Sequence, residues 1–203
     1  MSFKDYIKEN LPWIRSIYRK RLAPINLIHN IFDKPVVVLL YHRVNYLNRD
    51  LFNINVTPDN FERHIRILKN HYNVITFNDL KRNDIKEPSV IITFDDGYYD
   101  NYKYAFPILK KYQVPATIFI TSGGVDTGKE FWWDRLETVL FENKNLRESI
   151  ELDILNQRHV FDVSDDKKRL HSFYTLHHML FSLHPNERDM ILDRWYESYG
   201  LKV

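Results

Sequence analysis

One short apolar run limits the folds open to this chain more than any other stretch does. Residues 89–98 read S-V-I-I-T-F-D-D-G-Y, and the part from Val90 to Phe94 carries no charge and is rich in β-branched residues. Strands that are covered on both faces have this composition, and they occur chiefly in parallel sheets flanked by helices. The run therefore predicts an α/β fold built on a parallel sheet.

Two carboxylates and a glycine end this run. Asp95, Asp96 and Gly97 would stand at the carboxyl end of the strand, where α/β folds place their chemistry. Neighbouring acids raise each other's pKa unless a cation keeps both ionised, so the pair suits a metal site with a nearby general base. An ordinary Asp-Gly turn explains the same residues about equally well. An EF-hand loop needs alternating ligands, and a glycosidase needs separated acids, so both fit worse.

The neighbouring segments alternate between short apolar runs and helical patterns. The elements that we predict are strands at 36–41, 74–76 and 116–121 and helices at about 57–71 and 105–112. His42 follows the first strand and Thr121 follows the last, so both would meet Asp95 at one edge of the sheet. A lone histidine at such an edge is more often structural than functional. His42 is therefore a candidate site residue for which the structural explanation is the commoner one.

The last third of the chain has a different pattern. The sequence Phe131-Trp132-Trp133-Asp134 leads into a predicted helix that ends at about residue 142. Trp133 could line a saccharide groove, although packing in the core is the commoner fate of tryptophan. Further predicted elements are a β-hairpin around Asn156-Gln157, a helix capped by Ser164, and a helix from about Pro185 to Gly200.

Overall charge and the lack of cysteine exclude some classes of function. Lys and Arg number 29 against 27 Asp and Glu, and the net charge of +2 gives no basis for nucleic-acid binding. The chain contains no cysteine, which excludes disulfides and thiolate metal sites. Any metal must therefore be held by oxygen and nitrogen ligands.

The positive charge is concentrated in residues 1–34, which hold seven basic and three acidic side chains. Leu11, Ile14 and Ile17 have helical spacing, and Arg19-Lys20-Arg21 follow them. Such a helix packs on the domain or, less commonly, lies on an anionic membrane surface. No stretch has the apolar core of a secretory signal or the length of a membrane span. We expect a cytoplasmic chain, with peripheral membrane contact as the alternative.

Thr93-Phe94-Asp95-Asp96-Gly97-Tyr98 resembles the first motif of the polysaccharide deacetylases, also called the NodB-homology or carbohydrate esterase family 4 domain. The segments 36–44 (V-V-V-L-L-Y-H-R-V), 114–120 (V-P-A-T-I-F-I) and 131–134 (F-W-W-D) resemble the branch associated with bacterial surface polysaccharides. The resemblance covers about residues 36–140.

The resemblance implies a metal-dependent hydrolase that removes acetyl groups from N-acetylated polysaccharides or oligosaccharides. By motif position, Asp95 would be the general base and Asp96 a ligand of a divalent metal, for which zinc is the expected ion. His42 and Trp133 are then the candidate substrate-binding residues.

The resemblance also implies two later metal-ligand histidines in a His-Ser/Thr-x-x-His motif, and this sequence does not contain that motif. The nearest histidines, His171, His177 and His178, have the wrong spacing and are expected to be surface or half-buried residues of a helix. The alternative function is therefore a catalytically incomplete remnant that at most binds saccharide, a partner chain or a membrane.

These expectations combine into one predicted architecture. It is a partial parallel (β/α) barrel of the NodB-homology type, with about four strands and a helical and hairpin C-terminal extension. The predicted divisions are a basic helical segment at 1–34, the front part of the barrel at 35–142, and the extension at 143–203. Exposed edges of such a partial sheet favour self-association.

Overall fold

A computed structural model describes residues 36–82, 85, 87–125, 128–155 and 157–200 of the 203-residue chain. The predicted basic helix within 1–34 lies outside the described residues. The chain divides into two compact units, the first ending at Thr121 and the second beginning at Ser122. The predicted limits at 35–142 and 143–203 concern the extent of the deacetylase-like region, and they stay a prediction.

The main sheet of the first unit is parallel throughout, and β5 (Ser89–Phe94) lies at its centre. β1 (Val36–Tyr41) pairs with β5 along its whole length. β4 (Asn73–Val74) pairs with the first residues of β5, and β6 (Thr117–Ile118) pairs with its last residues. The predicted strands at 74–76 and 116–121 are present but shorter than expected. This arrangement confirms the α/β fold and the partial parallel barrel of four strands.

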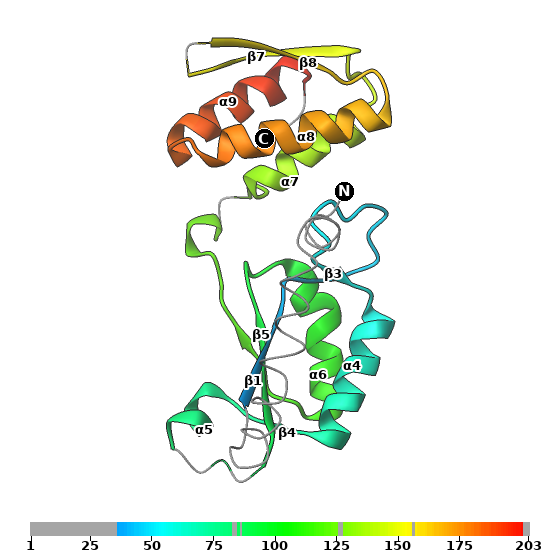
Figure 1. The fold of residues 1–203 in the computed structure, drawn as a ribbon, viewed down its shortest axis with the longest axis vertical. Coiled ribbons are helices and arrows are strands. Elements are labelled where there is room, and N and C mark those ends of the chain that lie inside the picture. The colour runs from blue at the N-terminus through cyan, green and yellow to red at the C-terminus, as the bar shows by residue number, and fades with distance from the viewer. Residues whose placement is uncertain (1–35, 83–84, 86, 126–127, 156, 201–203) are drawn as a thin grey trace, which may run out of the picture. The chain divides into compact units, whose positions relative to one another are not determined.

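Two helices pack on one side of this sheet, as Figure 1 shows for α4 (Pro58–His71) and α6 (Phe106–Tyr112). α4 begins as predicted, with Thr57 as the N-cap and its side chain accepting a hydrogen bond from the Asn60 amide. A π-helical turn, η2 (Asn101–Ala105), precedes α6. The two helices and the sheet enclose a core of buried apolar residues: Val44, Phe61, Ile65, Leu68, Val90, Ile92, Phe94, Ala105, Leu109 and Val114.

β5 explains why this core is continuous. Every residue of the strand is buried, which confirms the expectation from its uncharged sequence. The ring of Phe94 lies 5.5 Å from that of Tyr41 at the end of β1 and 5.7 Å from that of Phe61 in α4. The last residue before the acid pair is thus locked between a strand and a helix, which fixes the point at which the chain leaves the sheet.

Shorter elements fill the connections of the first unit. The predicted polar loop after β1 contains two short parallel strands, β2 (Arg43–Val44) and β3 (Asn55–Val56). A helical turn, α5 (Phe77–Lys81), follows β4 and is closed by a capping box between Thr76 and Asp79.

The second unit joins helices to an antiparallel hairpin (Figure 1). Its elements are η3 (Ser122–Gly124), α7 (Trp132–Glu137), η4 (Thr138–Glu142), β7 (Ser149–Ile154), β8 (Gln157–Asp162), α8 (Asp166–Phe181) and α9 (Pro185–Ser198). Alternate residues of β7 are buried, as the sequence pattern predicted. The hairpin and the helical extension are therefore confirmed.

Two details of this unit differ from the sequence prediction. The side chain that caps α8 is Asp165 and not Ser164; it accepts a hydrogen bond from the Lys168 amide. The helical spacing in the sequence predicts Leu170 on the same side as Phe173 and Leu180, but Leu170 is 39% exposed, because the buried stripe runs through Phe173, Leu176 and Leu180. Helical periodicity gave the right element, while the orientation of its first turn depends on the hairpin against which it packs.

Within the described part of the chain, no helix combines the length and the apolar character that crossing a bilayer requires.

Candidate active site

Three strand ends of the first unit meet through backbone hydrogen bonds. The amide of Asp95 donates to the carbonyl of Tyr41 at 3.0 Å, which ties the exit of β5 to the exit of β1. The amide of Thr121 donates to the carbonyl of Asp96 at 3.3 Å, which ties in the segment after β6. The predicted meeting of His42, Asp95 and Thr121 at one edge is therefore correct.

The backbone at Asp96 and Gly97 is held in an unusual conformation. Both residues have a left-handed backbone, with φ of 70° at Asp96 and 77° at Gly97. A Cβ atom at position 97 would lie 3.2 Å from the Cα of Ile120, so glycine is needed for space as well as for conformation. A non-glycine residue such as Asp96 adopts this region at a cost of roughly 1–2 kcal/mol. This strain turns the Asp96 backbone sharply away from the direction of β5.

Asp96 sits in an electrostatically unfavourable place for a carboxylate. Its burial raises its pKa above the ordinary range, and the neighbouring charge of Asp95 acts in the same direction. The charge of His42 acts in the opposite direction and lowers the pKa of Asp96. His42, Asp95 and Asp96 thus form one electrostatic group, and all three are partly exposed to solvent.

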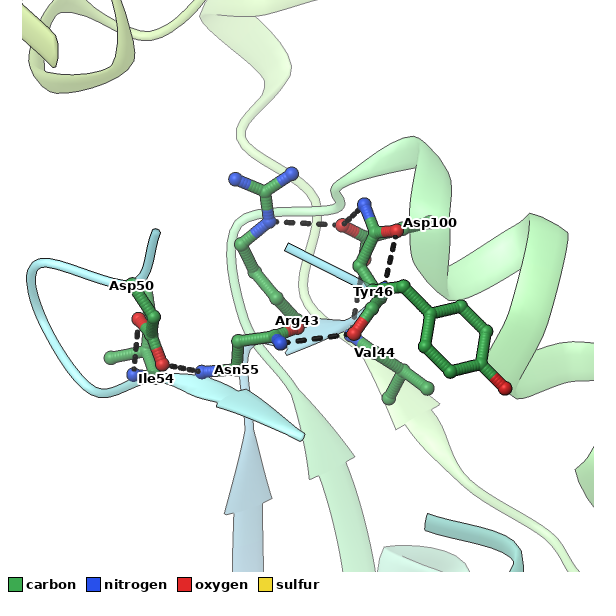
Figure 2. Close-up of polar contacts among 8 residues, drawn as sticks. Arg43, Val44, Tyr46, Asp50, Ile54, Asn55 and Asp100 are labelled. Atoms are coloured by element: carbon green, nitrogen blue, oxygen red, sulfur yellow. Dashed lines mark hydrogen bonds and ion pairs between the residues drawn. The ribbon is translucent and has the colours of Figure 1, made fainter. Parts of the chain in front are cut away.

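A buried carboxylate that the sequence reasoning missed lies beside this group. Asp100 is 5% exposed and accepts hydrogen bonds from Arg43 Nε, the Val44 amide and Asn45 Nδ2 at 2.9, 3.2 and 3.4 Å. Figure 2 shows these contacts converging on Asp100 from the segment that follows β1. The sequence signal was the Tyr-Tyr-Asp that follows Gly97, which resembles an ordinary helix start. At that position Asp100 caps nothing and reaches across to β2.

Trp133, the other predicted substrate-binding residue, lies in the second unit. It is half-buried in α7, and its ring stacks on that of Phe131 at 4.8 Å with the planes 12° apart. It also meets the ring of Trp132 edge to face at 5.6 Å. Packing and a partly accessible ring are thus both present, and its role with a saccharide stays a prediction.

The histidines of α8 do not resemble a metal site. His171 and His178 are exposed, and His177 is half-buried with its ring stacked on Trp132 at 4.7 Å. Burial lowers the pKa of His177, as do the charges of His178 and Arg188. These contacts confirm the expectation of surface and half-buried helical residues.

Asp95, Asp96 and His42 suit a divalent ion by the chemistry of their donors, since zinc takes carboxylate oxygen and imidazole nitrogen. Their number and arrangement are a separate matter, because catalytic zinc normally has three protein ligands. Among the residues that the structure describes, no three His, Asp or Glu side chains form a group that could hold a metal ion. The donor types are thus suitable for zinc, but the described residues do not form a complete metal site.

Comparison with known proteins gives a consistent result for the central part of the chain. Residues 82–146 match the profile of the polysaccharide deacetylase family. The chain is 42% identical over 96 residues to YxkH of Bacillus subtilis (strain 168), a protein with the same family description, and the match covers 43% of this chain and 33% of that protein.

A second relative is poly-β-1,6-N-acetyl-D-glucosamine N-deacetylase of Staphylococcus aureus (strain MSSA476), which is 36% identical over 110 residues. This match covers 46% of the present chain and 38% of the relative. The chain thus spans between 33% and 38% of the length of these curated relatives. Among solved structures, IcaB from Ammonifex degensii matches at 28% identity with a TM-score of 0.43, covering 53% of this chain and 49% of that one.

The parallel sheet, with its acid pair after the central strand, defines an α/β protein. By the family match and the curated relatives, the middle of this chain is similar to part of a NodB-type polysaccharide deacetylase domain.

Proposed function

We propose that this chain is part of a hydrolase that removes N-linked acetyl groups from an amino-sugar polysaccharide. The observation that carries the proposal is the pair Asp95 and Asp96 at the exit of the central buried strand, with the charge of His42 acting on Asp96. The Staphylococcus aureus relative, whose name specifies N-deacetylation of poly-N-acetylglucosamine, supports this choice of bond and substrate class.

The reaction needs a general base, and Asp95 is proposed for that role. Water adds to the acetyl carbonyl carbon, the carbon–nitrogen bond breaks, and acetate and a free sugar amine result. Asp95 would accept the proton of the attacking water and return it to the leaving nitrogen. Asp96, with further ligands, would hold a divalent ion, for which zinc is proposed. When bound, such an ion makes the attacking water more acidic and polarises the carbonyl.

His42 and Trp133 are proposed to contact the saccharide, and for His42 the argument is its position. It follows Tyr41 directly, at the strand end whose carbonyl accepts the Asp95 amide. A sugar whose acetyl group reached Asp95 would therefore lie within range of the His42 ring.

The experiment measures acetate release from N-acetylglucosamine oligomers by the purified chain, together with its thermal unfolding with and without zinc. We expect zinc to raise the melting temperature of the parent, and D96N to lose this response. D95N should keep the response and lose hydrolysis, because an amide cannot accept the proton. D153N, which removes an exposed carboxylate from β7, is the matched control. A parent chain that does not respond to zinc would contradict the metal assignment.

The same measurements test the alternative of an incomplete remnant. Binding of the oligomers without acetate release, in a parent that does not respond to zinc, would favour a saccharide-binding module. Release of acetate that depends on both acids would exclude it.

A further inference from the structure

The position of His42 relative to Asp96 depends on a short stretch of chain that leaves the sheet. The β1–β5 pairing ends at Tyr41 and Phe94, so His42 is the first residue of its strand beyond the ladder. Beyond a ladder, the backbone stays in place only where other groups hold it. The chain that follows His42 therefore needs contacts outside the ladder to hold it.

Asp100 holds it. On the near side of His42, the Tyr41 carbonyl accepts the Asp95 amide. On the far side, Oδ1 of Asp100 accepts the Val44 amide at 3.2 Å, and Oδ2 accepts Arg43 Nε at 2.9 Å. Both anchors belong to residues 95–100, the same short segment that carries Asp96.

Arg43 adds a second connection between the two strand exits. Its guanidinium carbon lies 4.2 Å from the centre of the Tyr98 ring, within the range of a cation–π contact. The Arg43 side chain is 21% exposed and Asp100 5% exposed, so the pair is largely shielded from solvent. A shielded, charge-assisted hydrogen bond is stronger and more directional than a surface ion pair. Figure 2 shows Arg43 of β2 reaching Asp100.

We infer that Asp100 is a positioning residue of the candidate active site. It holds Arg43 and Val44, and thereby fixes the backbone that carries His42 relative to the segment that carries Asp96. Asp100 acts through these residues. The importance of this role for catalysis depends on the proposed deacetylase function, but the geometry can be measured without any hydrolysis.

The variant D100N is a direct probe of this arrangement. Asparagine has one oxygen where aspartate has two, so it cannot accept from Arg43 Nε and the Val44 amide with separate oxygens. Its NH₂ group would face a donor at one of the two positions. In the second unit, Asp193 pairs with Arg135, a guanidinium that is 3% exposed. D193N is the matched control, since it breaks an Arg–Asp pair that belongs to the second unit.

The readout is the NMR signal of the His42 ring at fixed pH, assigned by its loss in H42Q. In the parent background, D96N should shift this signal, because His42 and Asp96 follow the paired ends of β1 and β5. In the D100N background, we expect that shift to fall at least twofold, and in D193N to stay unchanged. Should D100N fail to fold, R43K replaces it. R43K keeps the Val44 bond and the positive charge but loses the Nε contact, and it should reduce the shift to a smaller extent.

An unchanged response of His42 in both D100N and R43K would overturn the inference, even if both variants melt at lower temperature. A parent chain that shows neither hydrolysis nor a response to zinc would count against the proposed function only. The two failures are thus distinguishable.

Discussion

One charged cluster in each unit of this chain shows the opposite arrangement of charge from the other. In the second unit, the buried guanidinium of Arg135 meets Asp193 at 2.6 Å and lies 4.6 Å from the Tyr196 ring. In the first unit, Asp95 and Asp96 stand side by side, and the charge that opposes that of Asp96 comes from His42. Stability explains the first arrangement and does not explain the second, so the acid pair is the better candidate for function.

Among the variants that test this comparison, R135A should lose the most unfolding free energy. Removing one member of a buried ion pair costs about 3–5 kcal/mol when the other is left uncompensated. Asp193 is 33% exposed and also pairs with Lys129, so we expect a smaller loss of about 2–3 kcal/mol. Urea unfolding followed by tryptophan fluorescence suits this test, because Trp132, Trp133 and Trp195 all lie in the second unit.

The control for that experiment is R158A, since Arg158 pairs with Glu151 on the hairpin and is 68% exposed. An exposed pair contributes little, and its loss should change stability by less than about 0.5 kcal/mol. Equal losses in the two variants would break the view that the second unit depends on its buried charge.

The next effect concerns the strained turn of the first unit. G97A should cost about 2–3 kcal/mol, because alanine disfavours a left-handed backbone and its Cβ would crowd the Ile120 backbone at 3.2 Å. G128A is the matched control: Gly128 has a similar φ of 67° but no atom within 4 Å of the added Cβ. It should lose only the conformational part, about 1–2 kcal/mol. Thermal unfolding followed by circular dichroism measures both, and equal losses would mean that the turn is not tightly packed.

A smaller effect separates a functional acid pair from a structural turn. If the pair is functional, D95N and D96N should leave stability unchanged or raise it by up to about 1 kcal/mol, because they relieve crowding of charge. If the acids instead accept structural hydrogen bonds, each variant should lose about 1 kcal/mol. Chemical unfolding at neutral pH decides between the two outcomes.

The pH dependence of stability should differ in sign between the two units. Burial raises the pKa of Asp96 above its ordinary 3.8, so the folded chain binds this proton more tightly than the unfolded chain does. The contribution of Asp96 to stability therefore declines as pH rises from 3.8 through the raised folded pKa. In the second unit, hydrogen bonds from Lys168 and Ser164 lower the pKa of Asp162 to about 2. Its contribution is present above 3.8 and is lost as pH falls toward 2.

Melting of the parent, D96N and D162N between pH 2 and 7 tests both signs. In D96N, the melting temperature should decline less as pH rises above 3.8. In D162N, it should decline less as pH falls below 3.8. If the melting temperature falls equally steeply with rising pH in the parent and in D96N, the pKa of Asp96 is not raised by folding.

The smallest effect on stability is expected at the open edge of the sheet. Val37, Val38 and Leu40 of β1 are 49%, 50% and 54% exposed, and among the described strands β1 pairs only with β5. We propose that this edge promotes self-association. V38K should reduce the average mass measured by light scattering at high concentration, with stability changed by less than about 0.5 kcal/mol.

The control here is V160K, which places a lysine at a residue of the second unit's hairpin that is 62% exposed. It should leave the mass unchanged. A parent chain that is monomeric at high concentration would contradict the proposed association.

The parts of the fold that could be predicted from the sequence depend on local pattern. The uncharged run of β5 and the Thr57-Pro58 start of α4 each determine their own conformation, and both were predicted correctly. β6 was predicted too long, because an apolar run does not show where pairing with β5 stops. The cap of α8 was displaced by one residue because Asp165 and Ser164 are chemically equivalent N-caps.

For the candidate site, the sequence predicted which strand ends meet but not what holds them together. The meeting of His42 with Asp95 and Asp96 follows from the shared direction of parallel strands. The role of Asp100 could not be predicted, since its partners lie 55 to 57 residues away along the chain. A long-range hydrogen bond leaves no periodic signal in the sequence.

The order of strands around β5 also bears on how the site comes into being. β5 pairs with β4 across 16 residues of sequence (Asn73 with Ser89), with β6 across 24 (Thr93 with Thr117), and with β1 across 53 (Val36 with Ser89). Closing a longer loop costs more entropy, so the β1 pairing should form last during folding. That pairing is the one that carries His42 to Asp96. A folding chain could thus pair both ends of β5, with β4 and with β6, and still lack an assembled site.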